Sequence, residues 1–379
     1  MQVDSKQALV AAIVFSIMGV FAMMTGPVYI GALVGQLGFD AGQASLIVSL
    51  EYLGVALASL CAAFWMHKIS WKVAGVLASI VIFVGNLLSV QQTSFEVLSV
   101  IRFVVGFLGE GTAFIIAIAV ISSTKDQQRN FGFSIASQVT FGVLALVTLP
   151  RVIAAYGFAG LMVPLAILAL LFSAAALWMP SGVSRAENAA EGSSAGSIWP
   201  ALIALLAMFI WCTGLGAIWN FAELIAVAGG LTQTEAGDAM AFSTACAIAG
   251  GLIASALGGR FGSLLPVAVA LSVQMVMIWL LQGEMSWIQF AMTAAVFQIF
   301  WNITGPFMMG AVAMSDPTGK VSVVIPAAQI GGLFLGLAVA GQLVTDTNLV
   351  PANYTAIICC VVALLVFAPV ALRLSKQAR

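Results

Sequence analysis

The feature that most constrains the fold is a series of long apolar runs that together occupy most of the chain. A helix needs about 20 predominantly apolar residues to cross a bilayer. The connections between the runs are short, with one exception described below. The pattern predicts twelve transmembrane helices, at residues 8–34, 42–66, 73–92, 97–122, 131–155, 158–179, 199–228, 236–258, 264–283, 286–312, 321–345 and 352–373.

Composition agrees with a protein that lies in a membrane. Hydrophobic residues make up 62% of the 379 residues and charged residues only 7%, whereas soluble domains carry about 25% charged residues. The formal net charge is −1 and basic patches are absent, so nucleic-acid binding has no support. We expect a monomer of the cell (inner) membrane whose partners are the bilayer, a small molecule and protons.

Enzymatic chemistry finds little support in the sequence. The only histidine is His67, and the five cysteines lie in apolar runs without the spacing of metal ligands. A membrane enzyme needs a convergent nucleophile, base or metal set. We therefore expect no enzyme activity, no cofactor and no metal. A membrane sensor stays a remote alternative, because the ends of the chain are too short for a soluble output domain.

One longer connection divides the chain into two halves. Residues 180–198 are rich in Gly, Ser and Ala, which is typical of a flexible linker. They separate two predicted six-helix bundles, at 1–179 and 199–379. The halves also repeat, since Gln138 in the fifth run has a counterpart in Gln329 of the eleventh. Parallel repeats of six helices predict a substrate site near the midplane between the halves.

The cations predict the orientation. With a cytoplasmic N-terminus, no outer loop contains a lysine or an arginine, and the positive-inside rule is obeyed throughout. Both termini are then cytoplasmic. The acidic loop residues on the outer side are Asp40, Glu96, Glu284 and Asp346.

Three local patterns accompany this topology. Two are short basic loops, LGGRFG at 257–262 and HKISWK at 67–72, and the third is Arg102 followed by the glycines at 106, 109 and 111. In these features the chain resembles the major facilitator superfamily. The resemblance implies that the loops latch the halves and that Arg102 is linked to proton coupling. Gly259 and His67 replace the usual acids of the loops, and the change at His67 puts the charge relay of the first half in doubt. The signatures of sugar porters, aromatic-acid symporters and drug antiporters are missing.

Charged residues inside the predicted spans mark the chemistry. An ionisable residue in hydrocarbon costs about 2.5–3.5 kcal/mol on insertion scales, so each is a functional candidate. At about 1.5 Å per residue, Glu51 lies near the midplane, Arg102 about 8–10 Å from the outer end of its helix, and Glu110 about 20 Å from that end. Arg151 and Glu223 lie within about two turns of outer ends, where they can reach the interface.

These positions lead to a hypothesis for proton coupling. Desolvation favours a neutral carboxyl, and a nearby arginine favours the ionised form. We therefore hypothesise that Glu51 or Glu110 carries the proton and that Arg102 modulates it. On an ideal helix Arg102 and Glu110 project about 80° apart, so Glu51 is the expected partner of Arg102, and Glu110 is expected to face other neighbours. A permanent Glu51–Arg102 ion pair that only fixes helix packing is the alternative.

Substrate contacts are expected on helices that line the cavity in this family, namely the first, fourth, seventh and tenth. Gly-Pro pairs at 26–27 and 305–306 are expected to loosen two of them. Aromatic surface with a few amides suits a small, partly apolar organic solute. The alternative for each aromatic is lipid contact or packing, and for Glu223 and Arg151 an interfacial anchor. The predicted contacts are Tyr29, Gln138, Trp219, Asn220, Glu223, Gln298, Trp301, Asn302 and Gln329.

The function predicted from these observations is secondary active transport of that solute by alternating access, driven by a proton gradient. Two alternatives stay open. One is an uncoupled facilitator or exporter of an amphipathic or anionic compound, with Arg102 as an anion contact. The other is the membrane sensor named above.

Overall fold

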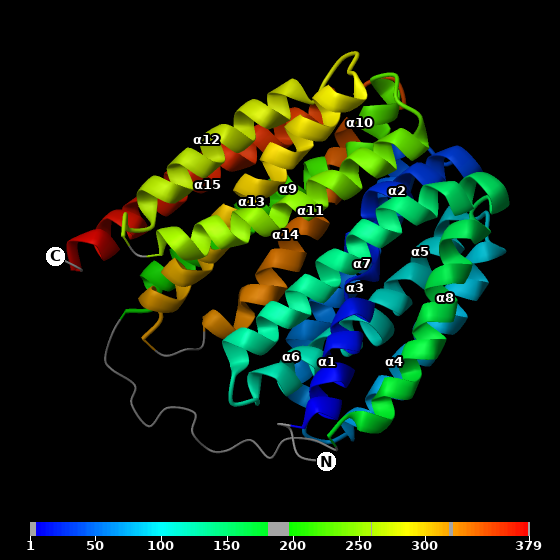
Figure 1. The fold of residues 1–379 in the computed structure, drawn as a ribbon, viewed down its shortest axis with the longest axis horizontal. Coiled ribbons are helices and arrows are strands. Elements are labelled where there is room, and N and C mark those ends of the chain that lie inside the picture. The colour runs from blue at the N-terminus through cyan, green and yellow to red at the C-terminus, as the bar shows by residue number, and fades with distance from the viewer. Residues whose placement is uncertain (1–4, 181–196, 259, 318–320, 378–379) are drawn as a thin grey trace. The chain divides into compact units, whose positions relative to one another are not determined.

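The computed structural model describes residues 5–180, 197–258, 260–317 and 321–377. All the regular secondary structure in these ranges is helical (Figure 1). Contacts between residues divide the chain into two compact units, Met1–Ala186 and Glu187–Arg379. Residues 181–196 of the predicted linker at 180–198 lie outside the described residues.

The first unit runs from blue to green in Figure 1. Its helices pack mainly in the pairs α4 with α8, α1 with α6, and α3 with both α5 and η1. The elements are α1 (Lys6–Met18), α2 (Phe21–Leu37), α3 (Ala41–Trp65), α4 (Trp71–Val90), α5 (Phe95–Val104), the π-helix η1 (Val105–Glu110), α6 (Gly111–Ser122), α7 (Gln127–Tyr156), α8 (Ala159–Ser173) and the 3₁₀-helix η2 (Ala174–Trp178).

The second unit is built around α9, which packs against both α14 and α15, and around the pair α11 and α13. Its elements are α9 (Trp199–Trp219), α10 (Ala222–Ala228), α11 (Gln233–Leu257), α12 (Leu264–Leu280), α13 (Trp287–Ser315), the 3₁₀-helix η3 (Ser322–Val324), α14 (Ile325–Leu343) and α15 (Val350–Gln377).

The described residues contain 11 helical spans long and apolar enough to cross a membrane. The remaining predicted span, at 264–283, is the apolar helix α12, which has 17 residues and ends earlier, at Leu280. Gly283 in the turn that follows has a φ of +78°, a conformation that favours glycine. Twelve apolar helical segments therefore stand where the sequence predicts them.

The first span of each unit is interrupted. The predicted helix 8–34 is divided into α1 and α2 at Gly19 and Val20, and the predicted helix 199–228 is divided into α9 and α10 at Asn220 and Phe221. At the first break the chain passes close to α6, because a Cβ on Gly19 would lie 2.7 Å from the backbone of Phe114. Glycine there permits the close approach.

The expected loosening at the Gly-Pro pairs takes a different form. Pro27 lies inside α2 and Pro306 inside α13, and both helices continue through them. A proline removes one backbone hydrogen bond, but neighbouring helices can hold a membrane helix in shape around it. The interruptions therefore fall elsewhere in the described helices than the proline positions predict.

The helices begin with local capping signals. The Asp40 side chain accepts from the Gln43 amide at 2.7 Å at the start of α3, and the Thr232 hydroxyl accepts from the Glu235 amide at 3.2 Å at the start of α11. Each is a capping box, which satisfies amides that a helix leaves unpaired at its start. The second span of each unit thus starts with the same device.

Two adjacent glycines of α11 provide a test of backbone packing. A Cβ on Gly250 would run into the Ile299 carbonyl of α13 and lie 2.9 Å from the Asn302 Cβ, whereas a Cβ on Gly251 meets nothing within 4 Å. We expect Gly250→Ala to lower the free energy of unfolding by about 1–3 kcal/mol through overpacking. Gly251→Ala is expected to leave it unchanged or raise it slightly. Thermal melting of the detergent-purified variants checks this, and equal melting temperatures contradict it.

Candidate functional site

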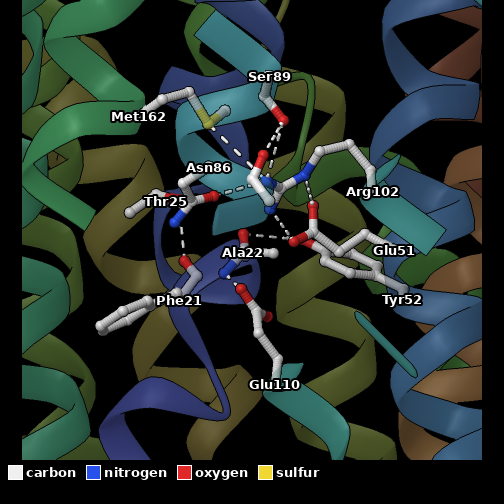
Figure 2. Close-up of polar contacts among 11 residues, drawn as sticks. Phe21, Ala22, Thr25, Glu51, Tyr52, Asn86, Ser89, Arg102, Glu110 and Met162 are labelled. Carbon is white, nitrogen blue, oxygen red and sulfur yellow. Dashed lines mark hydrogen bonds and ion pairs between the residues drawn. The ribbon is translucent and has the colours of Figure 1, made fainter. Parts of the chain in front are cut away.

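Arg102 of α5 and Glu51 of α3 form a buried ion pair in the first unit (Figure 2). Arg102 is 2% exposed and Glu51 0% exposed. The Arg102 Nε donates to Glu51 Oε2 at 3.0 Å, and Nη2 donates to Oε1. A guanidinium that binds a carboxylate through two N–H groups is among the stronger charge-assisted contacts. The partner of Arg102 is therefore the one expected from the sequence.

The third donor nitrogen of Arg102 is also engaged, by side chains of α4 and α8. Nη1 donates to Asn86 Oδ1 at 2.6 Å and lies 3.5 Å from Ser89 Oγ and 3.9 Å from Met162 Sδ. The guanidinium carbon lies 5.5 Å from the centre of the Tyr29 ring, within the range of a cation–π contact. In this conformation each of the three guanidinium nitrogens donates to a protein group.

Glycines bring the two helices of the ion pair together. A Cβ on Gly54 of α3 would lie 2.6 Å from both the Phe103 carbonyl and the Phe107 amide, and a Cβ on Gly106 would run into the Glu51 carbonyl. Backbones therefore touch where α3 crosses α5 and η1. Small residues allow this approach in membrane bundles, and they set the separation at which Glu51 reaches Arg102.

The π-helix η1 changes where Glu110 points. A π-helix takes more residues per turn than an α-helix, so each residue advances the angle less. Six residues of this kind change the angle of about 80° that an ideal helix places between Arg102 and Glu110. The Glu110 side chain, 2% exposed, also faces the Glu51 carboxyl. The expectation that Arg102 and Glu110 face different neighbours is therefore wrong.

Glu110 also reaches the break in the first span. Its Oε2 accepts from the Ala22 amide at 3.4 Å, in the first turn of α2. The Tyr52 hydroxyl of α3 donates to the carbonyl of the same alanine at 3.3 Å. Figure 2 shows these contacts beside the ion pair. One polar network thus connects α2, α3, α4, α5 and η1.

Tyr29, a predicted substrate contact, lies against this network. It is 1% exposed, and its hydroxyl makes no hydrogen bond to any residue that the structure describes. A buried hydroxyl without a partner is unfavourable. The Tyr29 hydroxyl therefore offers a free donor and acceptor inside the first unit.

Aromatic side chains gather in the second unit, and they include the predicted contacts Trp219 and Trp301. Their ring centres lie 6.0 Å apart with an interplanar angle of 82°, and the Phe297 ring lies 5.9 Å from Trp301 at 68°. Edge-to-face contacts of this kind are the favourable geometry of aromatic pairs. The cluster joins the end of α9 to α13 and fixes the orientation of both tryptophans.

The predicted amide contacts nearby bond to their own helices. Asn220 Nδ2 donates to the Gly216 carbonyl at 3.2 Å, and Asn302 Nδ2 donates to the carbonyl of Gln298 at 3.0 Å. The Gln298 side chain, 5% exposed, lies on the same helix as Asn302. These bonds satisfy part of the hydrogen-bonding capacity of Asn220 and Asn302.

The two candidate interfacial anchors behave differently. Glu223 of α10 is 2% exposed, and its Oε2 has no hydrogen-bond partner among the described residues. Arg151 is exposed, and its Nη1 donates to the Val147 carbonyl one turn earlier. An interfacial side chain is expected to be exposed, which fits Arg151 and does not fit Glu223.

The two predicted glutamines are half-buried, one in each unit. Gln138 Nε2 donates to Ser134 Oγ at 3.1 Å, and that serine donates to Ser16 Oγ at 2.7 Å. Gln329 Nε2 lies 3.8 Å from Met309 Sδ. Gln138 therefore belongs to a polar chain between α7 and α1, whereas the Gln329 amide contacts a weak sulfur acceptor.

Three buried amides, Asn86, Gln274 and Asn353, were not among the predicted residues, and the first two lie deep in their spans. Asn86 completes the Arg102 network, and Gln274 of α12 accepts from Trp211 Nε1 at 3.1 Å and donates to Thr304 Oγ1 at 2.9 Å. Each stands in the middle of an apolar run. Because an unpaired amide is costly in an apolar setting, that position alone was a signal that each has a partner.

The sulfur and acidic side chains do not converge on a metal. Within the described ranges, no group of three His, Cys, Asp or Glu is placed to hold a metal ion. All five cysteines are free, and Cys212 and Cys360 are buried among apolar side chains. They pack as small hydrophobic residues.

Comparison with known proteins identifies the fold. No family model and no curated relative matches the sequence. Solved structures match over nearly the full length. One is the nucleoside transporter NupG, with 13% identity, a TM-score of 0.74 and 98% of each chain covered. Two others are a proton dependent oligopeptide transporter (14% identity, TM-score 0.71, 97% of this chain and 99% of that chain covered) and a D-xylose-proton symporter (12% identity, TM-score 0.74, 94% of this chain and 96% of that chain covered). The chain has the major-facilitator fold.

The major-facilitator fold explains several observations made above. The apolar spans belong to a multi-pass membrane protein, and the three neighbours are membrane transporters, not enzymes. Of the two basic loops that carry the sequence resemblance, Gly259 lies outside the described residues, whereas residues 66–70 form the turn between α3 and α4.

Proposed function

We propose that the protein is a proton-coupled secondary transporter that moves a small, partly apolar organic solute across the cell (inner) membrane by alternating access. The observation that carries this proposal is the buried network in which two carboxyls, Glu51 and Glu110, lie beside a single guanidinium, Arg102, which is hydrogen-bonded to Glu51. One carboxyl is in excess, and an isolated charge is unfavourable in a dry interior. A proton compensates that excess, and its movement is the means of coupling.

The proposed substrate contacts lie in both units. Tyr29 and Glu223 each hold a buried polar atom without a hydrogen bond among the described residues, which supports a role for each in binding a polar group of the solute. The aromatic cluster of Trp219, Trp301 and Phe297 supplies apolar surface for the rest of the molecule. The remaining proposed contacts are Gln138, Asn220, Gln298, Asn302 and Gln329.

Uptake by proteoliposomes tests the coupling. Purified protein is reconstituted, and accumulation of a radiolabelled solute is followed with and without an imposed pH gradient. We expect accumulation above the equilibrium level only with the gradient. Uptake that ignores the gradient in both directions, at equal membrane potential, contradicts proton coupling and leaves facilitated transport in place.

A binding screen identifies the solute needed for that assay. A ligand that binds only the folded state raises its stability, by about 2.7 kcal/mol at a hundredfold excess over Kd. Melting temperatures of the purified protein are compared across nucleosides, sugars, peptides, organic acids and aromatic compounds. We expect one partly apolar class to raise the melting temperature of the wild type, and less so that of Trp301→Ala. Stabilisation confined to strongly charged compounds contradicts the proposed class.

An uncoupled facilitator or exporter with Arg102 as an anion contact is the second candidate. Arg102 donates to Glu51 and Asn86 and is 2% exposed, which favours the coupled reading over this one. Arg102→Lys keeps the charge but loses the planar fork. If this variant weakens solute binding and leaves proton-driven accumulation intact, the anion-contact reading is preferred.

We further propose that both termini are cytoplasmic and that the protein acts as a monomer. The distribution of loop cations supports the orientation. Reporter fusions at the C-terminus, one active only in the cytoplasm and one only outside it, test the orientation. Size-exclusion chromatography with light scattering tests the monomer.

A further inference from the structure

The Glu51–Arg102 pair is complete without Glu110. Both oxygens of Glu51 accept N–H groups of Arg102, and the other terminal nitrogen of Arg102 donates to Asn86. Close backbone packing at Gly54 and Gly106 holds the two helices of the pair together. The pair is therefore neutral and held in place by its surroundings, and among the described residues no hydrogen bond joins Arg102 to Glu110.

Glu110 has different partners. Its carboxyl accepts from the Ala22 amide at 3.4 Å and lies beside the Glu51 carboxyl. Two ionised carboxyls side by side repel each other, and a proton on one of them removes the repulsion. Both oxygens of Glu51 accept N–H groups of Arg102, whereas Glu110 accepts one backbone amide. The proton therefore belongs to Glu110.

The other groups around Glu110 do not remove this need for a proton. The ionisable side chains that face it are Glu51 and Arg102, with the hydroxyls of Tyr29 and Tyr52 close by. Of the other helices packed on η1, α4 has its only charged residue, Lys72, in its first turn, and α6 has none. Among the described residues, no second cation faces the two carboxyls.

The Ala22 contact connects the proton to the break in the first span. Ala22 is in the first turn of α2, and the residue that caps this helix, Val20, makes no side-chain hydrogen bond to it. The start of a helix carries a partial positive charge that favours an anion. An ionised Glu110 is therefore repelled by Glu51 and attracted by the start of α2.

We propose that Glu110 binds and releases the coupling proton, and that its deprotonation breaks the contact with Glu51 and strengthens the contact with the start of α2. In this step the O–H bond of the Glu110 carboxyl breaks, the proton passes to water, and the electron pair stays on the carboxylate. Glu51 and Arg102 keep their ion pair throughout. The inference rests on the proposed function, because only a proton-coupled transporter has a coupling proton. The protonation of Glu110 can be tested without transport.

Infrared difference spectroscopy of the purified protein during a pH jump provides that test. We expect a carbonyl band of a protonated carboxylic acid that disappears at high pH, is absent in Glu110→Gln, and remains in Glu223→Gln. Labelling the protein with ¹³C-glutamate should shift the band. In labelled Glu110→Asp an unshifted aspartic acid band should replace it, which covers the case in which Glu110→Gln does not fold. Persistence of the shifted, pH-dependent band in the double variant Glu110→Asp, Glu223→Gln, which also lacks the buried carboxyl whose oxygen has no partner among the described residues, overturns the assignment.

Hydrogen–deuterium exchange tests the link to α2. After correction for intrinsic pH dependence, amides of residues 19–25 should become better protected when Glu110 loses its proton, and this change should be absent in Glu110→Gln. Equal pH dependence in both proteins overturns the proposed movement. If both spectroscopic results are as expected but uptake ignores the pH gradient, the proposed function fails and the assignment of the proton stands.

Discussion

Replacing Arg102 with methionine is expected to lower the free energy of unfolding by about 3–5 kcal/mol, because it leaves the buried Glu51 carboxylate without a counter-charge. It also removes the donor to Asn86 Oδ1. Thermal or denaturant unfolding in detergent measures the change. Arg151→Met is the matched control, since that arginine is exposed, and its effect is expected within about 0.5 kcal/mol.

A double variant separates the missing charge from the missing volume. When Glu51→Gln is added to Arg102→Met, both charges of the pair are gone, and removing a whole buried pair is often nearly neutral. We expect the double variant to recover a large part of the lost stability. If instead the two losses add, the ion pair is not what the single substitution disrupts.

Replacing Glu110 with glutamine is expected to abolish proton-driven accumulation while the protein stays folded. A pH difference of one unit is worth 1.36 kcal/mol per proton. If one proton moves with each solute, the wild type therefore accumulates solute about tenfold, and Glu110→Gln only equilibrates it. Glutamine keeps the shape of a protonated glutamate and can donate the same hydrogen bond to Glu51, so exchange of solute should continue.

Two comparisons make this result specific. Glu284→Gln removes an exposed carboxyl in a turn of the second unit and should leave tenfold accumulation intact. Glu51→Gln should reduce stability as well as accumulation, because Arg102 then loses its partner. Full accumulation by Glu110→Gln, together with its loss in Glu51→Gln, would assign the proton to Glu51 instead.

The two halves of the polar network differ in how far the sequence could predict them. Glu51 and Arg102 were paired because each is a charge inside an apolar run, and because Glu110 was placed about 80° away from Arg102 on an ideal helix. The position of Glu110 was predicted incorrectly, because an ideal helix was assumed between it and Arg102. A π-helix has no clear signature in this stretch, and its formation depends on how η1 packs against α3 and α4.

The second unit shows the same division. Trp219 and Trp301 were each predicted as substrate contacts, and the tertiary structure brings their rings together. The burial of Glu223 was not decided by its place in the sequence, because a residue near the end of a span can reach the interface or turn inward. The break at Asn220 and Phe221, which starts the separate helix α10, places this carboxyl inside.

The sequence by itself determined the class of protein, the positions of the apolar spans and the identity of the charged residues within them, because hydrocarbon demands long apolar helices and penalises each charge. Only the tertiary structure decided which polar groups meet. Those meetings depend on the break between α1 and α2, on the π-helix η1 and on glycine contacts between backbones, and each of these is set by packing between helices far apart in the chain. That is why Glu110 joins Glu51, and why its proton was visible only in the fold.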